Sequence, residues 1–487
     1  MSAAYMEEND AYRQYFEASG SDEDTIHSAV RREDLRTTPL VSLEVKCAVE
    51  EESGDTLFPQ YALLGKHVGG CDDIPVAEPI LLNTNAPQSA FICGSQGSGK
   101  SYTLSCMLEN CLRPDHTLGK LIKPLTGVVF HYDRNGASAV AEAASLCSMG
   151  IKVRVLVSRS WYRQRAASYH AVPGSTPENM EVLPLLFQDH HLEADRILKL
   201  MAFSDSENGM PLYMNVLMRI LRDTAVNNRK LELAGLERQL AAESFSPGQR
   251  TMLELRMELM KSFCASSAKQ ALATAQARAH SKVQKQAVAQ QQPPIPEHDV
   301  FALPPGTLTI IDLTDPFVDS STACVLFDMC LGLITEGKHL GDSSGLVIAL
   351  DEAHKFLNQS PAADEFTEQI LTTIRMQRHC AARVLVATRS PPSRSACSIC
   401  ARSPAWFTAI RNHLGGASAL TASVEEQKAM FERIVQLPVG ESLLFSPSSY
   451  VCMADDGRPG KLGSGVMRMK TRMRRGVDAG RSVLGVR

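Results

Sequence analysis

The chain has 487 residues, of which 44% are hydrophobic and 21% charged, a composition that is ordinary for a soluble globular protein. Its formal net charge of −4 favours neither nucleic acid nor membrane as a partner, and no apolar run approaches the ~18 residues that cross a bilayer. The opening stretch is polar and acidic rather than apolar, so we expect no signal peptide, no membrane contact and an intracellular location, cytoplasmic or nuclear.

Charge is unevenly distributed along the chain. Residues 1–58 contain 14 Asp and Glu against five Lys and Arg, whereas residues 457–487 contain nine Lys and Arg against one Asp. The acidic segment has little apolar periodicity, so we expect 1–58 to be largely disordered, with one short added strand within LVSLEVKCAV. We expect the basic tail to be solvated and flexible. The alternative is a contact with a nucleic-acid backbone, because clustered Lys and Arg bind phosphates.

From Pro59 onward, short apolar strands alternate with helical patterns. The expected strands are rich in Val, Ile and Leu, as buried parallel strands are, and lie at 89–93, 127–132, 151–157, 306–313, 345–350, 383–388 and 441–446. Helical patterns fall between them, for example at 101–112, 137–149, 321–336 and 361–377. This alternation predicts a doubly wound α/β fold around a mostly parallel sheet.

One long region interrupts the alternation. Residues 178–299 are rich in helical patterns, contain no clear strand and end in a polar Ala/Gln/Lys-rich stretch followed by prolines. We therefore expect five segments, which are a largely disordered 1–58, a first part of the core at 59–177, an all-helical insertion with a low-complexity linker at 178–299, a second part of the core at 300–456, and the basic tail at 457–487.

The stretch GSQGSGKS joins the strand expected at 89–93 to the helix expected at 101–112, and it fits the phosphate-binding pattern G-x-x-x-x-G-K-[ST] without a mismatch. Its glycines let successive backbone N–H groups point at a phosphate, and the helix adds its positive end. Lys100 is expected to reach the β- and γ-phosphates, and the Ser101 hydroxyl to bind Mg²⁺. The predicted nucleotide-binding residues are Gly94, Ser95, Gln96, Gly97, Ser98, Gly99, Lys100, Ser101 and Tyr102.

The stretch LVIALDEAHKF supplies two carboxylates directly after an apolar strand. In P-loop proteins an acid at the end of such a strand helps to hold the metal, which assigns Asp351 to Mg²⁺ together with Ser101. Glu352 is then placed to polarise the attacking water as a general base. A helix-capping role does not account for two adjacent acids in a chain with this glycine loop, so we expect hydrolysis of a nucleoside triphosphate.

A hydroxyl group at a third strand end is a further candidate. Thr388 closes the strand expected at 383–388, and we expect that strand to lie beside the one that carries Asp351. A hydroxyl at this place either senses the γ-phosphate or simply ends the strand in a turn.

Three stretches together resemble the HerA/FtsK superfamily of P-loop ATPases, particularly its HerA branch: GSQGSGKS after a strand, LDEAHKF late in the chain, and IRMQRHCAARVLVATRSP after it. LPVGESLLFSP is similar to the closing strand of that family, and residues 59–455 also resemble a set of uncharacterised fungal P-loop proteins that share the opening ILLNTNAPQSAFICGSQGSGKS. The letters DEAH do not indicate a DEAH-box helicase, because the gap between Lys100 and Asp351 is too long and no second-domain arginine motif follows.

The resemblance implies a RecA/FtsK-like fold, ATP as the nucleotide, and a hexameric motor that translocates DNA or protein with nucleotide bound between subunits. Carried over to this chain, it assigns the phosphates and Mg²⁺ to Lys100 and Ser101, the metal also to Asp351, and the water to Glu352. It further implies an arginine finger from a neighbouring subunit. We favour Arg378 among the candidates, which are Arg375, Arg378, Arg383, Arg402 and Arg411.

The chain departs from this family in two respects. No counterpart of the N-terminal barrel domain is expected before Pro59, and Arg389 stands where the family has a glutamine after the threonine. Two functions therefore remain, an ATP-hydrolysing oligomeric motor or switch with DNA as a candidate substrate, and a nucleotide-binding scaffold or regulator with weak or no hydrolysis. A small-molecule kinase is disfavoured, because no lid-like arginine cluster follows the glycine loop closely.

Overall fold

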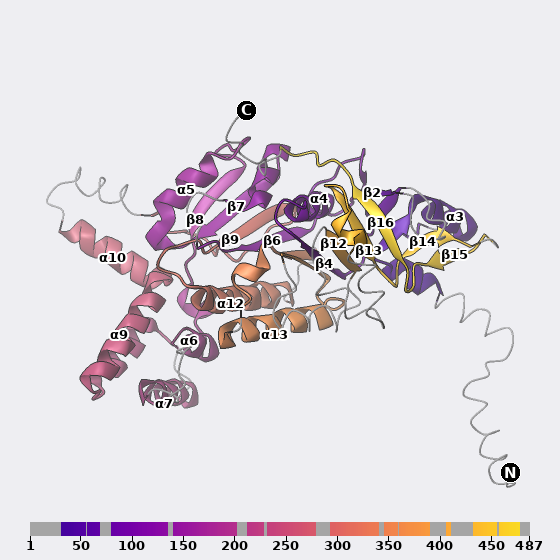
Figure 1. Cartoon of the computed structure of the whole chain (residues 1–487). Coiled ribbons are helices and arrows are strands. Elements are labelled where there is room, and N and C mark those ends of the chain that lie inside the picture. Colours follow the sequence, from indigo (N-terminus) through magenta and orange to yellow (C-terminus); the bar gives the residue numbers. More distant parts are fainter. Residues whose placement is uncertain are drawn as a thin grey trace, which may run out of the picture.

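The computed structural model describes residues 31–54, 56–68, 79–134, 140–201, 212–227, 231–278, 293–339, 345–358, 360–389, 406–410, 432–454 and 457–477. The strands within these ranges form one mixed sheet of 16 strands, and helices pack on both of its faces (Figure 1). None of the described helices is both long and apolar enough to cross a membrane.

The half of the sheet that carries the glycine loop is parallel. In spatial order its strands are β12 (Trp406–Ile410), β4 (Gln88–Gly94), β11 (Ala382–Thr388), β10 (Leu346–Leu350), β6 (Thr126–His131), β9 (Thr307–Asp312), β7 (Lys152–Val157) and β8 (Met180–Pro184). Every residue of β4, β6, β10 and β11 is buried, as the apolar runs predicted. The doubly wound α/β fold is thus confirmed, with β11 between the glycine-loop strand and the strand that ends at Asp351.

Helices cover the two faces of this parallel half (Figure 1). One face carries α4 (Lys100–Leu112), η1 (Glu142–Met149), η2 (Arg159–Trp161) and α5 (Tyr162–His170), and the other carries α12 (Ser320–His339), η4 (Ala353–Lys355) and α13 (Pro361–Arg375). Because side chains alternate along a strand, β6 sends Val129 towards α4 and Val128 and Phe130 towards α12 and α13. The Phe130 ring meets Phe327 edge-on, with 5.1 Å between ring centroids.

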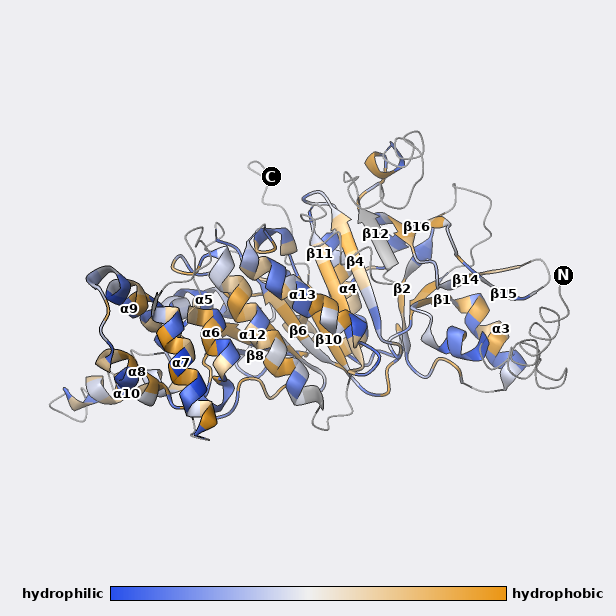
Figure 2. Ribbon diagram, turned by 90° about the horizontal axis from the view of Figure 1, so that it is seen from below, coloured by the Kyte–Doolittle hydropathy of each residue, from blue (hydrophilic) through white to orange (hydrophobic). Residues whose placement is uncertain are grey.

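The region between β8 and β9 is helical, and β8 itself extends the sheet to Pro184, beyond the boundary expected at 177. Its elements are η3 (Asp189–His191), α6 (Ala194–Met201), α7 (Leu212–Val226), α8 (Leu233–Ala242), α9 (Pro247–Ser262) and α10 (Ala265–Ala277). Apolar stripes on these helices alternate with polar faces (Figure 2). The buried side chains of α6 to α9 join the same core as α12 and α13, whereas those of α10 pack with Leu186 in a small cluster of their own. The polar Ala/Gln/Lys-rich stretch expected to be a linker is helical where it begins, as α10, and residues 279–292 of it lie outside the described residues.

The other half of the sheet is mostly antiparallel and combines segments that are far apart in sequence. Its strands are β1 (Leu40–Ser42), β2 (Tyr61–His67), β3 (Ile80–Leu82), β5 (Gly119–Lys120), β13 (Glu441–Phe445), β14 (Tyr450–Met453), β15 (Pro459–Lys461) and β16 (Val466–Thr471). β16 lies between β13 and β2 and is antiparallel to both. The strand predicted at 441–446 is therefore present as β13, in antiparallel pairing.

Two expectations drawn from charge require correction. Leu40–Ser42 form β1, the short strand expected within LVSLEVKCAV. Leu43–Ser53 form α3 rather than a disordered segment, because Val41, Val45 and Val49 pack with Phe58 in a small core of their own. Residues 459–471 of the basic tail are strands rather than a flexible tail. In β16, VMRMKT alternates, so that Met467 and Met469 are buried while its basic residues point the other way. Residues 1–30 and 478–487 lie outside the described residues.

Candidate functional site

The glycine loop connects β4 to α4 in the conformation that the pattern requires. Gly97 and Gly99 have φ values of 75° and 99°, in the left-handed region where side chains other than glycine are strained. Within the loop the backbone N–H and the hydroxyl of Ser98 both donate to the carbonyl oxygen of Ser95, at 3.3 and 2.7 Å. The buried Lys100 folds back over the loop, and its Nζ donates to the same carbonyl oxygen at 2.9 Å. The loop thus surrounds the free N–H groups at the start of α4.

A hydroxyl and a carboxylate meet at this helix terminus. Ser101 Oγ donates to Oδ1 of Asp351 at 3.1 Å, although the two residues are 250 positions apart. Asp351 directly follows β10 and is buried, and burial raises the pKa of its carboxyl group, against the opposing effects of His131 and of the Ser101 hydrogen bond. A hydroxyl beside a carboxylate is a donor set that suits Mg²⁺. The structure therefore brings together the two residues predicted to bind the metal.

Glu352 has an uncommon backbone conformation, with φ 52° and ψ 40°. This conformation directs its carboxylate to three basic groups: Lys100 Nζ at 4.0 Å from Oε1, and Arg389 Nε and His354 Nε2 at 3.2 and 3.5 Å from Oε2. Burial lowers the pKa of Lys100 and of His354, while the Glu352 carboxylate opposes both shifts. The residue predicted to be the general base is thus held in an ion pair with Arg389, the residue that departs from the family pattern.

These groups line a cavity of about 470 Å³ at the carboxyl ends of the parallel strands. Its walls include Gln96, Gly97, Gly99, Lys100, Ser101, Tyr102, His131, Asp133, Val140, Glu142, Asp351, Glu352, Lys355, Arg389 and Val439. The sequence reasoning missed His131, Asp133, Glu142 and Lys355. Asp133 accepts from Lys355 Nζ at 2.7 Å, which ties the turn that follows β6 to η4.

Thr388 and the candidate arginines occupy different places. Thr388 is buried at the end of β11, in register with Cys93 of β4, and β11 pairs with β10 as predicted. Arg378 is exposed in the turn between α13 and β11. This turn precedes the amino end of β11, whereas the cavity lies at the carboxyl ends of the parallel strands. Arg383 is buried and donates to the carbonyl oxygens of Thr84 and Asn85, so it serves the fold rather than acting as a finger. Arg375 pairs with Glu368, and Arg402 and Arg411 lie outside the described residues.

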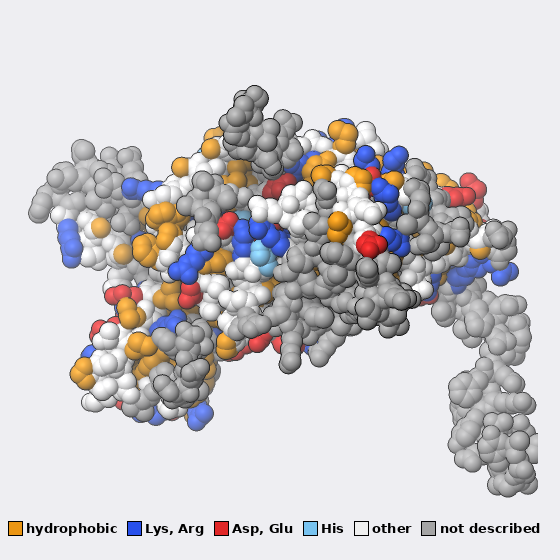
Figure 3. Space-filling model, viewed as in Figure 1, with side chains coloured by type: hydrophobic (Ala, Val, Ile, Leu, Met, Phe, Trp, Pro, Cys, Tyr) orange, Lys and Arg blue, Asp and Glu red, His pale blue; other side chains and the backbone are white. Residues whose placement is uncertain are grey.

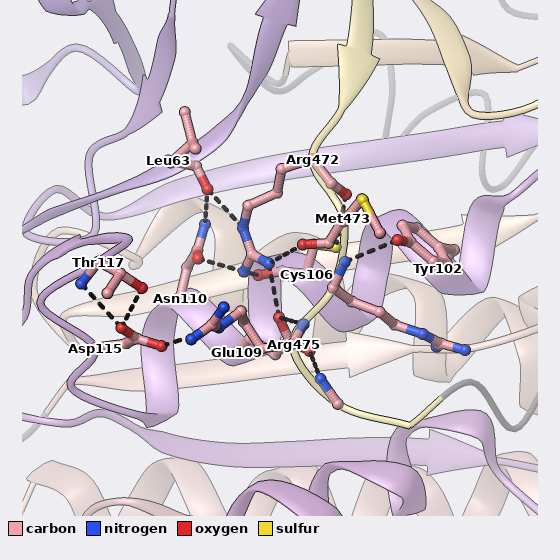
Figure 4. A network of polar contacts seen from close by, with 12 residues as sticks. Leu63, Tyr102, Cys106, Glu109, Asn110, Asp115, Thr117, Arg472, Met473 and Arg475 are labelled. Atoms are coloured by element: carbon pink, nitrogen blue, oxygen red, sulfur yellow. Dashed lines mark hydrogen bonds and ion pairs between the residues drawn. The ribbon is translucent and has the colours of Figure 1, made fainter.

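The segment that follows β16 runs along α4 and contacts the pocket wall (Figure 4). Arg472 Nη1 pairs with Glu109 at 2.8 Å, both side chains being buried. Arg474 Nη1 lies 2.6 Å from Glu142, its guanidinium lies over the ring of Tyr102, and its backbone N–H donates to the Tyr102 hydroxyl at 2.7 Å. Tyr102 and Glu142 both line the cavity. The chain after β16 therefore braces two residues of the pocket, an arrangement that no local sequence pattern indicates.

Most basic residues of the tail are paired with acids of the same chain. Lys461, Arg468, Arg472, Arg474 and Arg475 form ion pairs with Asp34, Glu441, Glu109, Glu142 and Asp115 respectively. On the face drawn in Figure 3, basic side chains occur in small groups with acidic ones among them. These pairs disfavour the alternative in which the tail contacts a nucleic-acid backbone.

A second cluster of polar residues lies in another cavity, of about 430 Å³. His190, His191 and Asp299 offer ligand atoms within 4.8 Å of one another, the spacing of a metal site. However, Nδ1 of His191 accepts a hydrogen bond from the backbone N–H of Gln188 at 3.1 Å, so the proton of the neutral ring is on Nε2, which faces Asp299 at 3.3 Å. A nitrogen that carries its proton cannot ligate a metal, and we interpret the cluster as a structural link.

The fold and the cavity together define a class. A glycine loop between a buried strand and a helix, a hydroxyl–carboxylate pair at the helix terminus and a second acid beside it are the features of an α/β P-loop fold. No protein-family model matches the sequence, and no curated protein matches it.

Solved structures that are similar to this chain include three with low sequence identity. VirB4 of Thermoanaerobacter pseudethanolicus is 12% identical, with 85% of this chain and 97% of that chain covered at a TM-score of 0.40. The plasmid coupling protein TrwB in complex with the non-hydrolysable GTP analogue GDPNP is 10% identical, with 87% and 97% covered at 0.42. The cytoplasmic domain of the Thermomonospora curvata Type VII secretion ATPase EccC is 11% identical, with 85% and 28% covered at 0.29.

Identities of 12% or less and TM-scores below 0.5 do not bear on what this chain binds or does.

Proposed function

We propose that the chain binds ATP with Mg²⁺ in the cavity at the start of α4 and hydrolyses it. The observation that supports this proposal is the Ser101–Asp351 hydrogen bond, in which a hydroxyl and a carboxylate from distant segments meet beside Lys100 while Glu352 faces the same cavity. A cap or a turn accounts for any one of these groups but not for their convergence from two distant segments.

Different residues of the cavity bind the phosphates and the metal. The backbone N–H groups of the loop and the first turn of α4, from Gly97 to Ser101, hold the phosphates, and Lys100 exchanges the Ser95 carbonyl oxygen for phosphate oxygens. Ser101 and Asp351 hold Mg²⁺, which when bound neutralises charge on the β- and γ-phosphates. Gly94, Ser95, Gln96 and Ser98 shape the loop, and Tyr102 forms the wall beside it.

Glu352 acts as the general base. It takes the proton of a water whose oxygen bonds to the γ-phosphorus while the bond from that phosphorus to the leaving oxygen of ADP breaks. Its left-handed backbone costs roughly 1–2 kcal/mol, a strain that fits a residue held in place for a reaction. Thr388, at the end of the strand between the two motifs, positions the γ-phosphate.

The Arg389–Glu352 ion pair favours a second function, a nucleotide-binding regulator with slow hydrolysis. A carboxylate that is paired with a cation is a weaker base, because the cation stabilises its charged form. Hydrolysis then requires that Arg389 leave Glu352, and Arg389 is 37% exposed and has room to do so. The ion pair then slows hydrolysis for as long as Arg389 remains on Glu352.

We further propose that the chain assembles as a homo-oligomer, a hexamer by the resemblance in its motifs. Arg378 is exposed near the amino ends of the parallel strands, at the opposite end from the cavity. There it is available to a neighbouring subunit as the arginine finger. DNA is the candidate substrate of such a motor.

The experiment is ATP turnover of the full chain and of Glu352→Gln, with and without duplex DNA, alongside a sizing measurement. Turnover by an oligomer that is lost in Glu352→Gln supports the ATPase, and stimulation by DNA supports the motor. A wild-type chain that binds ATP without turnover leaves only the regulator, and a chain that does not bind ATP overturns both.

A further inference from the structure

His131 lines the pocket but is not among the residues proposed to hold the phosphates, the metal or the water. It is the last residue of β6 and is only 4% exposed. Neither of its ring nitrogens has a hydrogen-bond partner among the described residues. Buried polar groups in folded proteins are nearly always hydrogen-bonded, so two unpartnered nitrogens on one buried ring call for a partner that the protein itself does not supply.

The register of the strands places His131 next to the metal-binding pair. β6 and β10 are parallel neighbours with Phe130 opposite Leu350, so the following residues, His131 and Asp351, are adjacent. Both lie on the α4 face of the sheet, because Val129 and Ala349, two positions earlier, pack there. His131 therefore faces the place where Ser101 and Asp351 meet.

A hydrated metal ion supplies the missing partner. Mg²⁺ binds few protein groups directly and keeps several of its waters, which need acceptors in a buried site. A neutral imidazole offers one acceptor nitrogen for such a water, and His131 brings its ring to this wall of the cavity. Acceptors in this second layer orient the directly bound groups and set metal affinity.

We propose that His131 is a third metal-site residue, whose imidazole accepts a hydrogen bond from a water bound to the Mg²⁺ that Ser101 and Asp351 hold. The proposal rests on the proposed function only in so far as a metal–nucleotide complex binds in this cavity. It does not require that the nucleotide be hydrolysed.

The test is a Mg²⁺ titration of ADP binding, followed with a fluorescent methylanthraniloyl-ADP and the full chain. The variants are His131→Asn and His131→Phe, and the matched control is His116→Asn, because His116 is exposed in the loop after α4. We expect the Mg²⁺ concentration at half-saturation to rise about tenfold in both His131 variants, the lower end of what loss of such a group costs in metal affinity. Binding in EDTA is expected to be unchanged, as are all properties of His116→Asn.

Melting temperature separates this role from a purely structural one. Because the ring makes no hydrogen bond to the described protein, neither variant is expected to melt at a lower temperature than the wild type. Wild-type-like Mg²⁺ dependence in His131→Asn and His131→Phe overturns the inference alone, as does an equal loss of binding with and without Mg²⁺. A wild-type chain that binds no ADP at any Mg²⁺ concentration instead overturns the proposed function.

Discussion

Replacing Arg472 by methionine removes one partner of a buried ion pair and keeps the aliphatic stem. In the wild type the guanidinium donates to the Leu63 and Cys106 carbonyl oxygens and to Asn110 Oδ1, at 2.8, 3.2 and 2.8 Å, in addition to its pair with Glu109 (Figure 4). In the variant the Glu109 carboxylate stays fully buried without its cation.

The expected cost follows from this burial. Removing one partner of a buried pair costs about 3–5 kcal/mol, because the other charge is left uncompensated. Glu109 still accepts from the backbone N–H groups of Arg475 and Gly476, at 3.3 and 3.2 Å, which places the expectation at the lower end, about 3 kcal/mol. A difference of 3 kcal/mol changes the local opening equilibrium roughly 100-fold.

Hydrogen exchange followed by mass spectrometry measures how often this region opens, and it does not require that the large chain unfold in a two-state manner. Peptides that span β16 and residues 472–476 are expected to exchange roughly 100-fold faster in Arg472→Met, as the shift in opening equilibrium requires. In Glu109→Gln/Arg472→Met much of the protection is expected to return, because no lone charge remains. The control is Arg475→Met, whose pair with Asp115 at 3.5 Å is half exposed and worth about 0–1 kcal/mol. Equal protection in Arg472→Met and Arg475→Met would refute the reasoning.

Three further predictions concern the pocket and the tail. Arg389→Gln is expected to raise single-turnover ATP hydrolysis up to about fivefold, because an ion pair at this exposure is worth about 1 kcal/mol, and slower hydrolysis would show that Arg389 assists the reaction. Glu352→Gly is expected to abolish turnover while stabilising the fold by about 1 kcal/mol through relief of the left-handed backbone, and a lower melting temperature would contradict that strain. A chain cut after Val477 is expected to melt cooperatively, as followed by circular dichroism, and to bind duplex DNA no more weakly than the full chain in a binding titration. A chain cut before Gly457 lacks β15 and β16 and is expected to be unfolded by circular dichroism.

The glycine loop, the two acids and the parallel strands were predictable because each is formed by residues that are contiguous in the sequence. The strand, loop and helix around Lys100 lie within one short stretch, and Asp351 and Glu352 follow an apolar run that only a buried strand explains. A local pattern of this kind predicts both the motif and the strand and helix that flank it. The meeting of Ser101 with Asp351 followed from the motif, and the structure places them in contact.

The tail could not be predicted in the same way, because its structure depends on partners far away in the chain. Arg472 and Arg474 read as solvated charges in a basic segment, and only the fold shows that Glu109 and Glu142 face them. His131 was equally hidden, since it ends an apolar run and nothing in the run distinguishes it. Its role follows from the register between β6 and β10, which no single sequence displays.

The position of β4 in the sheet has a consequence for how the molecule is made. β4 pairs with β11 and β12, which are synthesised only after the entire helical region between β8 and β9. Closing so long a loop costs little at equilibrium, since the entropy grows only with the logarithm of loop length. For most of synthesis, however, a strand that is buried along its whole length in the finished protein has neither of its neighbours, and such non-local pairing is slow and prone to aggregation. The nucleotide pocket is therefore assembled late, and we expect a nascent chain that has not yet reached β11 to depend on chaperones.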